Sequence, residues 1–327
     1  MVENIDVICT SLSPLHGVSM FDIALSALTT ILSVPLNLLI VASIIKYPHM
    51  LYRSFYLIIA NVALADLLAG LCICPLSVSF HAKEAMNLTI PEVEIKSLHS
   101  GFFITNGVSV LSMGLLSIDR LGILLNPFVY YAKVTRVRTI MMIIITWVLS
   151  GALVSMYFSF GYIRFLFMFS TTTLLVSMLF MIATVILFKY RLRQIENAER
   201  MRKPSCSTPQ IVDPRTNAKK QETLNNFTQM DAAITKTFIR MLLLFLINYI
   251  PAVGMTLYMN FFPTHSSCTF IHIMRDFIFL SILTSGLWRA INFYMCLRPL
   301  RDAAKTLLRC KRQRQAEDIT IHGIVKL

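Results

Sequence analysis

Two charged residues, Asp119 and Arg120, interrupt an apolar run of helical length, LSMGLLSIDRLGILLNPF, at residues 111–128. Charged side chains at the edge of a helix that crosses a membrane are costly, so they usually have a defined partner or a function. The chemistry that these two residues offer is the formation of ion pairs. The alternative is that Arg120 lies at the membrane interface and extends to the lipid headgroups.

A second cation, Arg289, lies inside another apolar run, residues 277–297. An Arg side chain keeps its proton, so within a membrane it needs a carboxylate or water beside it. Asp66 is the one carboxylate in the core of the other apolar runs, and a guanidinium can bind a carboxylate in a bidentate geometry. We therefore expect Arg289 to pair with Asp66. The alternative is that Arg289 faces lipid and extends towards the inner surface near Leu297.

The composition indicates an integral membrane protein. The chain has 327 residues, of which 56% are hydrophobic and 14% are charged, and its mean hydropathy is +0.66. A water-soluble protein carries roughly a quarter charged residues. The net charge of +13 gathers in a few polar segments, which favours cytoplasmic loops over a nucleic-acid interface. No basic segment precedes the first apolar run, so we expect that run to act as a signal anchor.

The apolar runs that must position these residues predict an all-α membrane protein, a bundle of seven transmembrane helices. Each run meets the length of about 20 residues that a bilayer requires. The predicted spans are Ile23–Ile45, Phe55–Phe80, Leu98–Leu125, Ile140–Phe160, Phe165–Phe188, Ile234–Asn260 and Phe277–Leu297. The short connection at residues 161–164 makes the fourth and fifth helices antiparallel neighbours.

Basic residues are most frequent in the odd-numbered loops and after the seventh span, which places the N-terminus outside. We expect an extracellular segment at 1–22, a receptor domain at 23–297 with a cytoplasmic loop at about 189–233, and a cytoplasmic tail at 298–327. The tail begins with a basic amphipathic helix, which would lie on the inner leaflet. The chain resembles neither an enzyme nor a metalloprotein, because no nucleophile, catalytic dyad, metal site or cofactor motif is legible among its residues, its seven Cys included.

Several motifs on these spans resemble those of the rhodopsin-like G-protein-coupled receptors, and the resemblance covers nearly the whole chain. The matches are Asn37, Asp66, Asp119-Arg120-Leu121 in place of Asp-Arg-Tyr, Trp147, and Tyr249 where the family has the Trp of Trp-x-Pro. The seventh-helix motif Asn-Pro-x-x-Tyr is reduced to its Tyr in the segment Ala290-Ile291-Asn292-Phe293-Tyr294.

Further departures resemble the melanocortin-type branch of that family. The second outer loop is minimal, and the fifth span, residues 165–188, contains no Pro. The usual disulfide to that loop cannot form, because no Cys lies between Cys74 and Cys206. However, the acids with which that branch binds calcium and peptides are replaced by Leu76, Ile95 and His99.

The resemblance implies an activation switch on the inner side, made of Asp119, Arg120, Asp231 and Tyr294. Arg120 would face the G-protein cavity and form a lock with Asp231 at the inner end of the sixth helix. The alternative for Asp231 is an acid that simply favours the N-terminal end of a helix.

The resemblance also implies a polar network within the membrane, made of Asn37, Asp66, Ser109, Arg289 and Asn292. Asp66 and Ser109 match sodium ligands, and Asp66 would face the seventh helix one position from Arg289. Because Ala290 stands where the family has Asn, we expect Arg289 to fill the sodium space. Alternatively, Asp66 is a structural centre of hydrogen bonds.

By the same resemblance, the ligand cavity would be lined by Phe102, Asn106, Tyr249, Asp276 and Thr284. Phe102 stands where amine receptors have Asp, which disfavours a biogenic amine. Thr284 stands where a retinal receptor needs Lys, which excludes retinal. For any single residue of this set, ordinary core packing is the alternative.

Four outer or tail positions are candidates for modification. Asn87, in the sequon Asn87-Leu88-Thr89, is predicted to carry a glycan. Cys9 and Cys268 are two outer thiols that would pair in an oxidising compartment, with two free thiols as the alternative. Cys310 resembles a palmitoylation site, with a free thiol as the alternative.

The sequence therefore predicts a receptor of the plasma membrane with an unknown extracellular ligand. Its expected partners are a heterotrimeric G protein, an arrestin and membrane lipid, with no nucleic acid. Two alternatives stay open: a receptor-like protein that binds or traffics without coupling, and a seven-span transporter or channel. Against the latter, such proteins usually contain internal repeats, and we find none.

Overall fold

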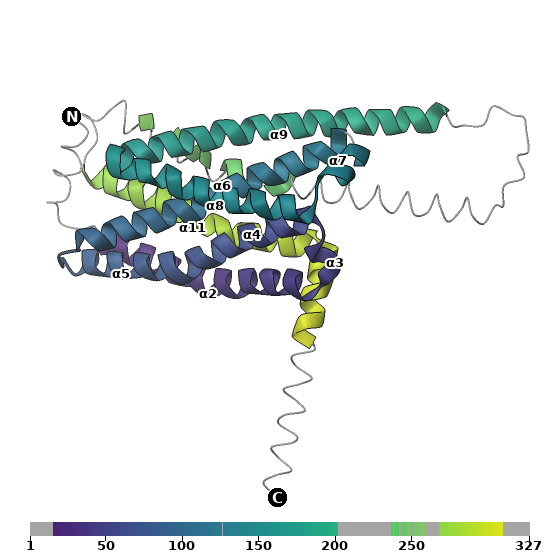
Figure 1. The fold of residues 1–327 in the computed structure, drawn as a ribbon. Coiled ribbons are helices and arrows are strands. Elements are labelled where there is room, and N and C mark those ends of the chain that lie inside the picture. The colour runs from purple at the N-terminus through teal and green to yellow at the C-terminus, as the bar shows by residue number, and fades with distance from the viewer. Residues whose placement is uncertain are drawn as a thin grey trace, which may run out of the picture.

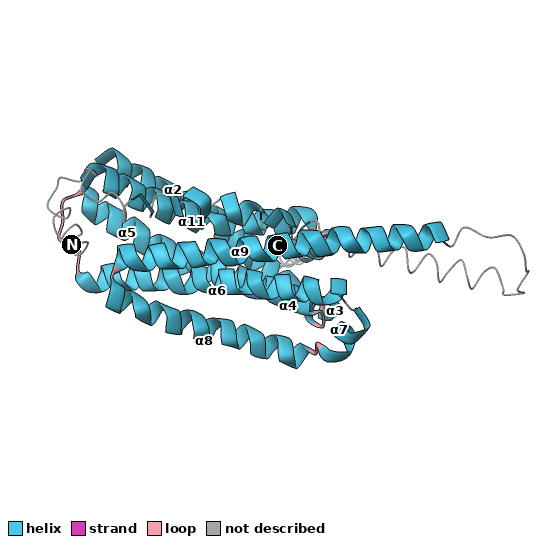
Figure 2. Cartoon of the chain, turned by 90° about the horizontal axis from the view of Figure 1, so that it is seen from above, coloured by secondary structure: helices cyan, strands magenta, loops and turns pink. Residues whose placement is uncertain are grey.

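The computed structural model describes residues 16–125, 127–201 and 268–309, together with parts of the segment 237–258. Within these residues the chain is almost entirely helical and has no strand. The long helices lie side by side as one elongated bundle (Figures 1 and 2). The helices are α2 (His16–Lys46), α3 (Pro48–Leu51), α4 (Ser54–Leu68), the π-helix η1 (Ala69–Ile73), α5 (Cys74–Ala85), α6 (Glu92–Leu125), α7 (Pro127–Lys133), α8 (Arg136–Phe160), α9 (Tyr162–Met201) and α11 (Cys268–Cys296).

The helices match the seven predicted spans in order, and the predicted fold class is confirmed. Within the described residues, five segments are long and apolar enough to cross a membrane: His16–Lys46, Ser54–Ala85, Glu92–Ile123, Arg136–Phe160 and Asp276–Cys296. The predicted fifth span lies in α9, and the apolar helix Ile239–Pro251 lies in the predicted sixth. Exposed apolar side chains such as Ile31, Val148 and Leu179 cover the outside of the bundle, which suits a bilayer as solvent.

The outer ends of the helices extend beyond the predicted spans. The predicted outer loop at residues 81–97 shrinks to residues 86–91, because α5 continues to Ala85 and α6 already begins at Glu92. Polar pairs between these two ends support the extra turns: Ser79 donates a hydrogen bond to Glu94 at 2.9 Å, and Lys83 forms an ion pair with the same carboxylate. Apolar length alone could not reveal these turns, since their residues are polar.

Two local features explain the paths of the second and fourth helices. Pro75 cannot donate the usual backbone hydrogen bond and crowds the preceding turn, and the helix widens into the π-helix η1 next to it. The connection from α8 to α9 is a single residue, Gly161, with φ +74°. Glycine adopts this conformation without a steric penalty, so the two helices reverse within one residue.

The buried core has an inner and an outer apolar cluster. The inner cluster includes Ile44, Leu116 and Phe293, and the outer cluster includes Phe103, Leu166 and Tyr249. In α6 and α11, polar residues separate the part that supplies the inner cluster from the part that supplies the outer cluster.

The predicted amphipathic helix is present at residues 298–309. Leu300, Ala303 and Ala304 are buried against the inner end of the bundle, whereas Lys305 and Arg309 are exposed. The helix runs across the end of the bundle rather than continuing α11 (Figure 1). The contact of this helix with the inner leaflet stays a prediction. The predicted domain boundaries also stay predictions.

Candidate functional site

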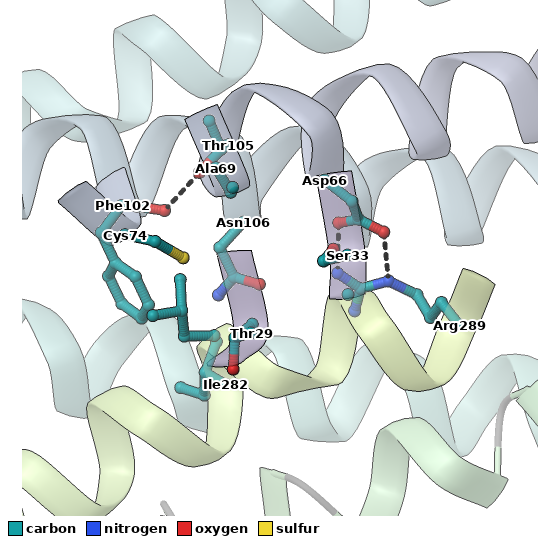
Figure 3. A pocket seen from close by; sticks show the side chains of 13 residues that line it. Thr29, Ser33, Asp66, Ala69, Cys74, Phe102, Thr105, Asn106, Ile282 and Arg289 are labelled. Carbon is teal, nitrogen blue, oxygen red and sulfur yellow. Dashed lines mark hydrogen bonds and ion pairs between the residues drawn. The ribbon is translucent and has the colours of Figure 1, made fainter. Parts of the chain in front are cut away.

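The centre of the bundle contains a buried ion pair between α4 and α11. Arg289 donates two hydrogen bonds to Asp66, from Nη2 to Oδ1 at 2.6 Å and from Nε to Oδ2 at 3.1 Å. The side chains are only 7% and 4% exposed. The guanidinium points at the carboxylate from the facing helix (Figure 3). The expected bidentate pairing is therefore present, and the alternative of an Arg289 extending through lipid does not hold.

Two serines and a glycine complete the surroundings of this pair. Ser109 on α6 donates to Asp66 Oδ1 at 3.0 Å, and Arg289 Nη1 donates to Ser285 Oγ at 2.8 Å. Gly286 lets the carboxylate approach α11 closely, since a Cβ atom there would lie 3.1 Å from Asp66 Cγ. Arg289 thus contacts both carboxylate oxygens of Asp66, the residue that was predicted as a sodium ligand.

The two asparagines of the predicted network bond within their own helices. Asn37 is fully buried and donates to the carbonyl oxygen of Ser33 at 3.0 Å and to its hydroxyl at 2.9 Å. Asn292 accepts a hydrogen bond from Cys296 at 3.1 Å. Neither forms a hydrogen bond with Asp66 that links the helices, so the cross-helix network is smaller than predicted.

A small cavity lies beside the ion pair, towards the outer side. Its volume is about 20 Å³, enough for one ordered water, and Phe102, Asn106, Asp66 and Arg289 all line it (Figure 3). Asn106 accepts a 2.7 Å hydrogen bond from the hydroxyl of Tyr249. Tyr249 is completely buried. One compact group therefore links the third helix, the sixth helix and the ion pair.

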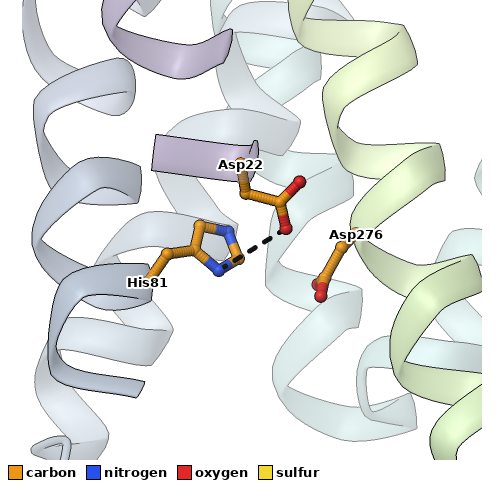
Figure 4. A group of neighbouring side chains, drawn as sticks. All are labelled: Asp22, His81 and Asp276. Atoms are coloured by element: carbon orange, nitrogen blue, oxygen red, sulfur yellow. Dashed lines mark ion pairs between the residues drawn. The ribbon is translucent and has the colours of Figure 1, made fainter. Parts of the chain in front are cut away.

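The five residues predicted to line a ligand cavity do not share one space. Phe102, Asn106 and Tyr249 belong to the group just described. Thr284 instead lines a second, mainly apolar cavity of about 420 Å³ between α2 and α11. Asp276 is buried near Asp22 and His81 (Figure 4). Whether any of the five binds a ligand stays a prediction.

The inner end of α6 holds Arg120 in a second polar group. Arg120 Nε donates to Asp119 Oδ2 at 3.0 Å, and its guanidinium carbon lies 4.5 Å from the centre of the Phe55 ring. The other oxygen of Asp119 accepts hydrogen bonds from Ser54, at 2.7 Å, and from Tyr130. Burial and the nearby Asp119 carboxylate raise the pKa of the Tyr130 phenol above its usual value, so the phenol keeps the proton that it donates.

The remaining predicted site residues are placed only in part. Asp231, Cys9 and Cys310 lie outside the described residues, and Cys268 begins α11 without a described side chain. The lock between Arg120 and Asp231 and the pairing of Cys9 with Cys268 therefore stay untested. Tyr294 is partly buried on α11, and Asn87 is exposed in the loop between α5 and α6.

The sequence interpretation missed several residues that hold these groups in place. Tyr130, Ser54 and Ser285 contact charged residues although no motif marks them. Trp147 was identified, but not its partner Asn61, whose Oδ1 accepts the indole hydrogen bond at 2.9 Å. Asn61 in turn donates to Ser112 at 2.7 Å and joins α4, α6 and α8. The sequence signal that could have identified these residues is that most of them are polar residues in or next to an apolar run.

Comparison with protein families gives a match to a receptor family. The family described as "7 transmembrane receptor (rhodopsin family)" matches residues 36–287, a range that includes Asp66, Arg120 and Tyr249. No curated protein matches the chain.

Proposed function

Because the chain belongs to the rhodopsin family of seven-transmembrane receptors, we propose that it binds an extracellular ligand and activates a heterotrimeric G protein. The chain is a multi-pass membrane protein and a receptor of this family rather than an enzyme. We place it in the plasma membrane with residues 1–22 outside and residues 298–327 inside.

The arrangement around Arg120 is the observation that carries this proposal. Arg120 is only 5% exposed, and its partner Asp119 is fixed by Ser54 and Tyr130 from neighbouring elements. Arg120 is held by the adjacent residue Asp119 at the inner end of α6. If this ion pair breaks, the Arg120 side chain can turn to face the cytoplasm instead. Such a two-state element is what a ligand must bias in order to signal across a membrane.

The route from the ligand to this switch begins at the group around Tyr249. A ligand that displaces Phe102 or Asn106 disturbs the 2.7 Å hydrogen bond to Tyr249 on the sixth helix. The same cavity borders Asp66 and Arg289, so the change reaches the seventh helix as well. Movement of the inner end of the sixth helix would then release Arg120 towards the G protein.

The finer assignments are part of the same proposal. The single-residue connection at Gly161 supports the melanocortin-type branch, and Phe102 argues against an amine ligand. Asp231 and Tyr294 would act with Arg120, and an arrestin would bind the same inner face. Asn87 would carry a glycan, Cys310 a palmitoyl group, and Cys9 and Cys268 would form a tether outside.

A receptor that does not couple is the second candidate. The observation in its favour is the fixed ion pair of Arg289 with Asp66, which adds a strong link between the second and seventh helices where the family motif is reduced. Such a protein would bind its ligand and reach the cell surface, but it would leave Asp119 and Arg120 paired.

A ligand-pool screen with a second-messenger readout tests the two candidates. Cells that display the receptor should respond to an active fraction, and cells that display the Arg120→Ala variant at the same surface level should not. Saturable binding of the active fraction without any G-protein response would support the second candidate instead. A response that persists in Arg120→Ala would contradict the proposed switch.

A further inference from the structure

Two aspartates and a histidine from three helices meet in the outer half of the bundle. They are Asp22 on α2, His81 on α5 and Asp276 on α11, and each offers a ligand atom within 4.8 Å of the others. The three residues are 1%, 2% and 5% exposed. In Figure 4 the two carboxylates and the imidazole ring face a common point between the helices.

A fourth residue, Glu84, contacts the imidazole ring of His81 at Nδ1. Glu84, one turn after His81, has its Oε2 atom 3.1 Å from His81 Nδ1 and also accepts a 3.4 Å hydrogen bond from Ser19. A carboxylate that holds Nδ1 of a histidine fixes the orientation of the ring and leaves Nε2 as the nitrogen that binds a metal.

The spacing of the ligand atoms fits a small divalent cation. Zinc binds nitrogen and oxygen ligands at about 2.0–2.2 Å in a tetrahedron, which puts the ligand atoms roughly 3.3–3.6 Å apart. The ligand atoms of Asp22, His81 and Asp276 lie within 4.8 Å of one another, so side-chain rotations bring the set to this spacing. Calcium would instead need six to eight oxygen ligands.

The kinds of ligand also point to a divalent cation. Asp22, Asp276 and Glu84 bring three carboxyl groups to one imidazole. Imidazole is a ligand that suits zinc, whereas magnesium and calcium prefer oxygen ligands alone, so the His81 ring favours zinc.

We propose that Asp22, His81 and Asp276 bind one Zn²⁺ ion that joins the first, second and seventh helices, with Glu84 as the residue that orients His81. Three protein ligands leave the fourth position of the tetrahedron open. Asp22 also lines the 420 Å³ cavity between α2 and α11, which supplies the access route and a place for a small ligand on the metal. This site is independent of the proposed G-protein coupling.

Zinc binding to purified full-length receptor in detergent micelles tests the site. Equilibrium dialysis should give one saturable equivalent of Zn²⁺, and Zn²⁺ should raise the melting temperature because it binds the folded state. The isosteric variants Asp22→Asn and Asp276→Asn should each weaken zinc affinity by more than tenfold. Glu84→Gln should weaken it by about tenfold, as loss of an orienting partner does.

Two matched variants control for general effects on the outer surface. His99→Gln removes another outer histidine, which bonds to Tyr157, and Glu92→Gln removes an acid that pairs with Lys96. Both should bind zinc like the unaltered receptor. Absence of saturable Zn²⁺ binding by the unaltered receptor would overturn the proposal, and so would unchanged affinity in Asp22→Asn and Asp276→Asn. Displacement of Zn²⁺ by a moderate excess of Ca²⁺ would also contradict it.

Discussion

Arg289 on α11 binds both carboxylate oxygens of Asp66 on α4, with nitrogen-to-oxygen distances of 2.6 and 3.1 Å. The pair lies between the inner and outer apolar clusters, where a lone charge would be very unfavourable. It fixes the relative position of the second and seventh helices, since a bidentate contact tolerates little sliding or rotation.

Loss of one partner of this pair should destabilise the receptor more than loss of both. Asp66→Asn and Arg289→Ala should each reduce the free energy of unfolding by about 3–5 kcal/mol, because each leaves the other group buried without its counter-charge. The double variant should recover part of that loss. Surface expression and melting temperature of the four receptors measure the effect.

Ser285→Ala is the matched control for the ion pair. It removes one hydrogen bond from Arg289 but no charge, so it should cost only about 1 kcal/mol. If the double variant equals the sum of the two single variants, the pair contributes no coupling and this account of Arg289 is wrong.

Gly286 should not tolerate alanine, because the added Cβ would lie 3.1 Å from Asp66 Cγ. Gly286→Ala should therefore lower the melting temperature. Gly151 in α8 provides the control, since a Cβ there meets no atom within 4 Å. Gly151→Ala should stabilise the helix by roughly 0.5–1 kcal/mol. Equal effects of the two substitutions would mean that α4 and α11 are not closely packed at this point.

The sequence could predict the bundle and the central ion pair because both follow from strong local costs. Apolar length identifies a span, and Arg289 inside a membrane needs a carboxylate, of which Asp66 was the one available. The outer ends of α5 and α6 could not be predicted in this way, because polar contacts such as Lys83 with Glu94 extend them.

Contacts between separate helices were the main features that the sequence could not reveal. Asp22, His81 and Asp276 are far apart in the chain, and no spacing rule joins them. Tyr130 lies in the short helix α7, so only the fold places its hydroxyl beside Asp119. The predicted ligand residues lie apart for the same reason, since Thr284 lines the cavity beside α2 and Asp276 lies near Asp22 and His81.

Tyr130 should make the receptor sensitive to alkaline pH. Burial and Asp119 raise the pKa of this phenol, so the stability that its neutral form contributes is complete below about pH 10 and is lost as the pH rises further. Tyr130→Phe cannot ionise, and its melting temperature should fall less steeply above pH 10 than that of the unaltered receptor. Tyr190→Phe, at an exposed tyrosine, should behave like the unaltered receptor. Parallel pH profiles for all three would contradict the partly buried contact of Tyr130 with Asp119.

Glycan mapping in eukaryotic cells tests the orientation of the bundle. Asn87 is exposed in the loop between α5 and α6, which is predicted to lie outside, so it should carry a glycan that Asn87→Gln removes. The sequon Asn226-Phe227-Thr228 falls in the predicted cytoplasmic loop and should remain unmodified. A glycan on Asn226 would reverse the proposed topology.

Ligand-independent nucleotide exchange by purified G proteins tests the central proposal most directly. Asp119→Asn weakens the hold on Arg120 and should raise the exchange rate about fivefold or more over the unaltered receptor, within the range of typical coupling energies. Adding Arg120→Ala to Asp119→Asn should return the rate to that of empty micelles. Exchange that is independent of Arg120, or no exchange with any class of G protein from either the unaltered receptor or Asp119→Asn, would contradict the proposal that this receptor signals through Arg120.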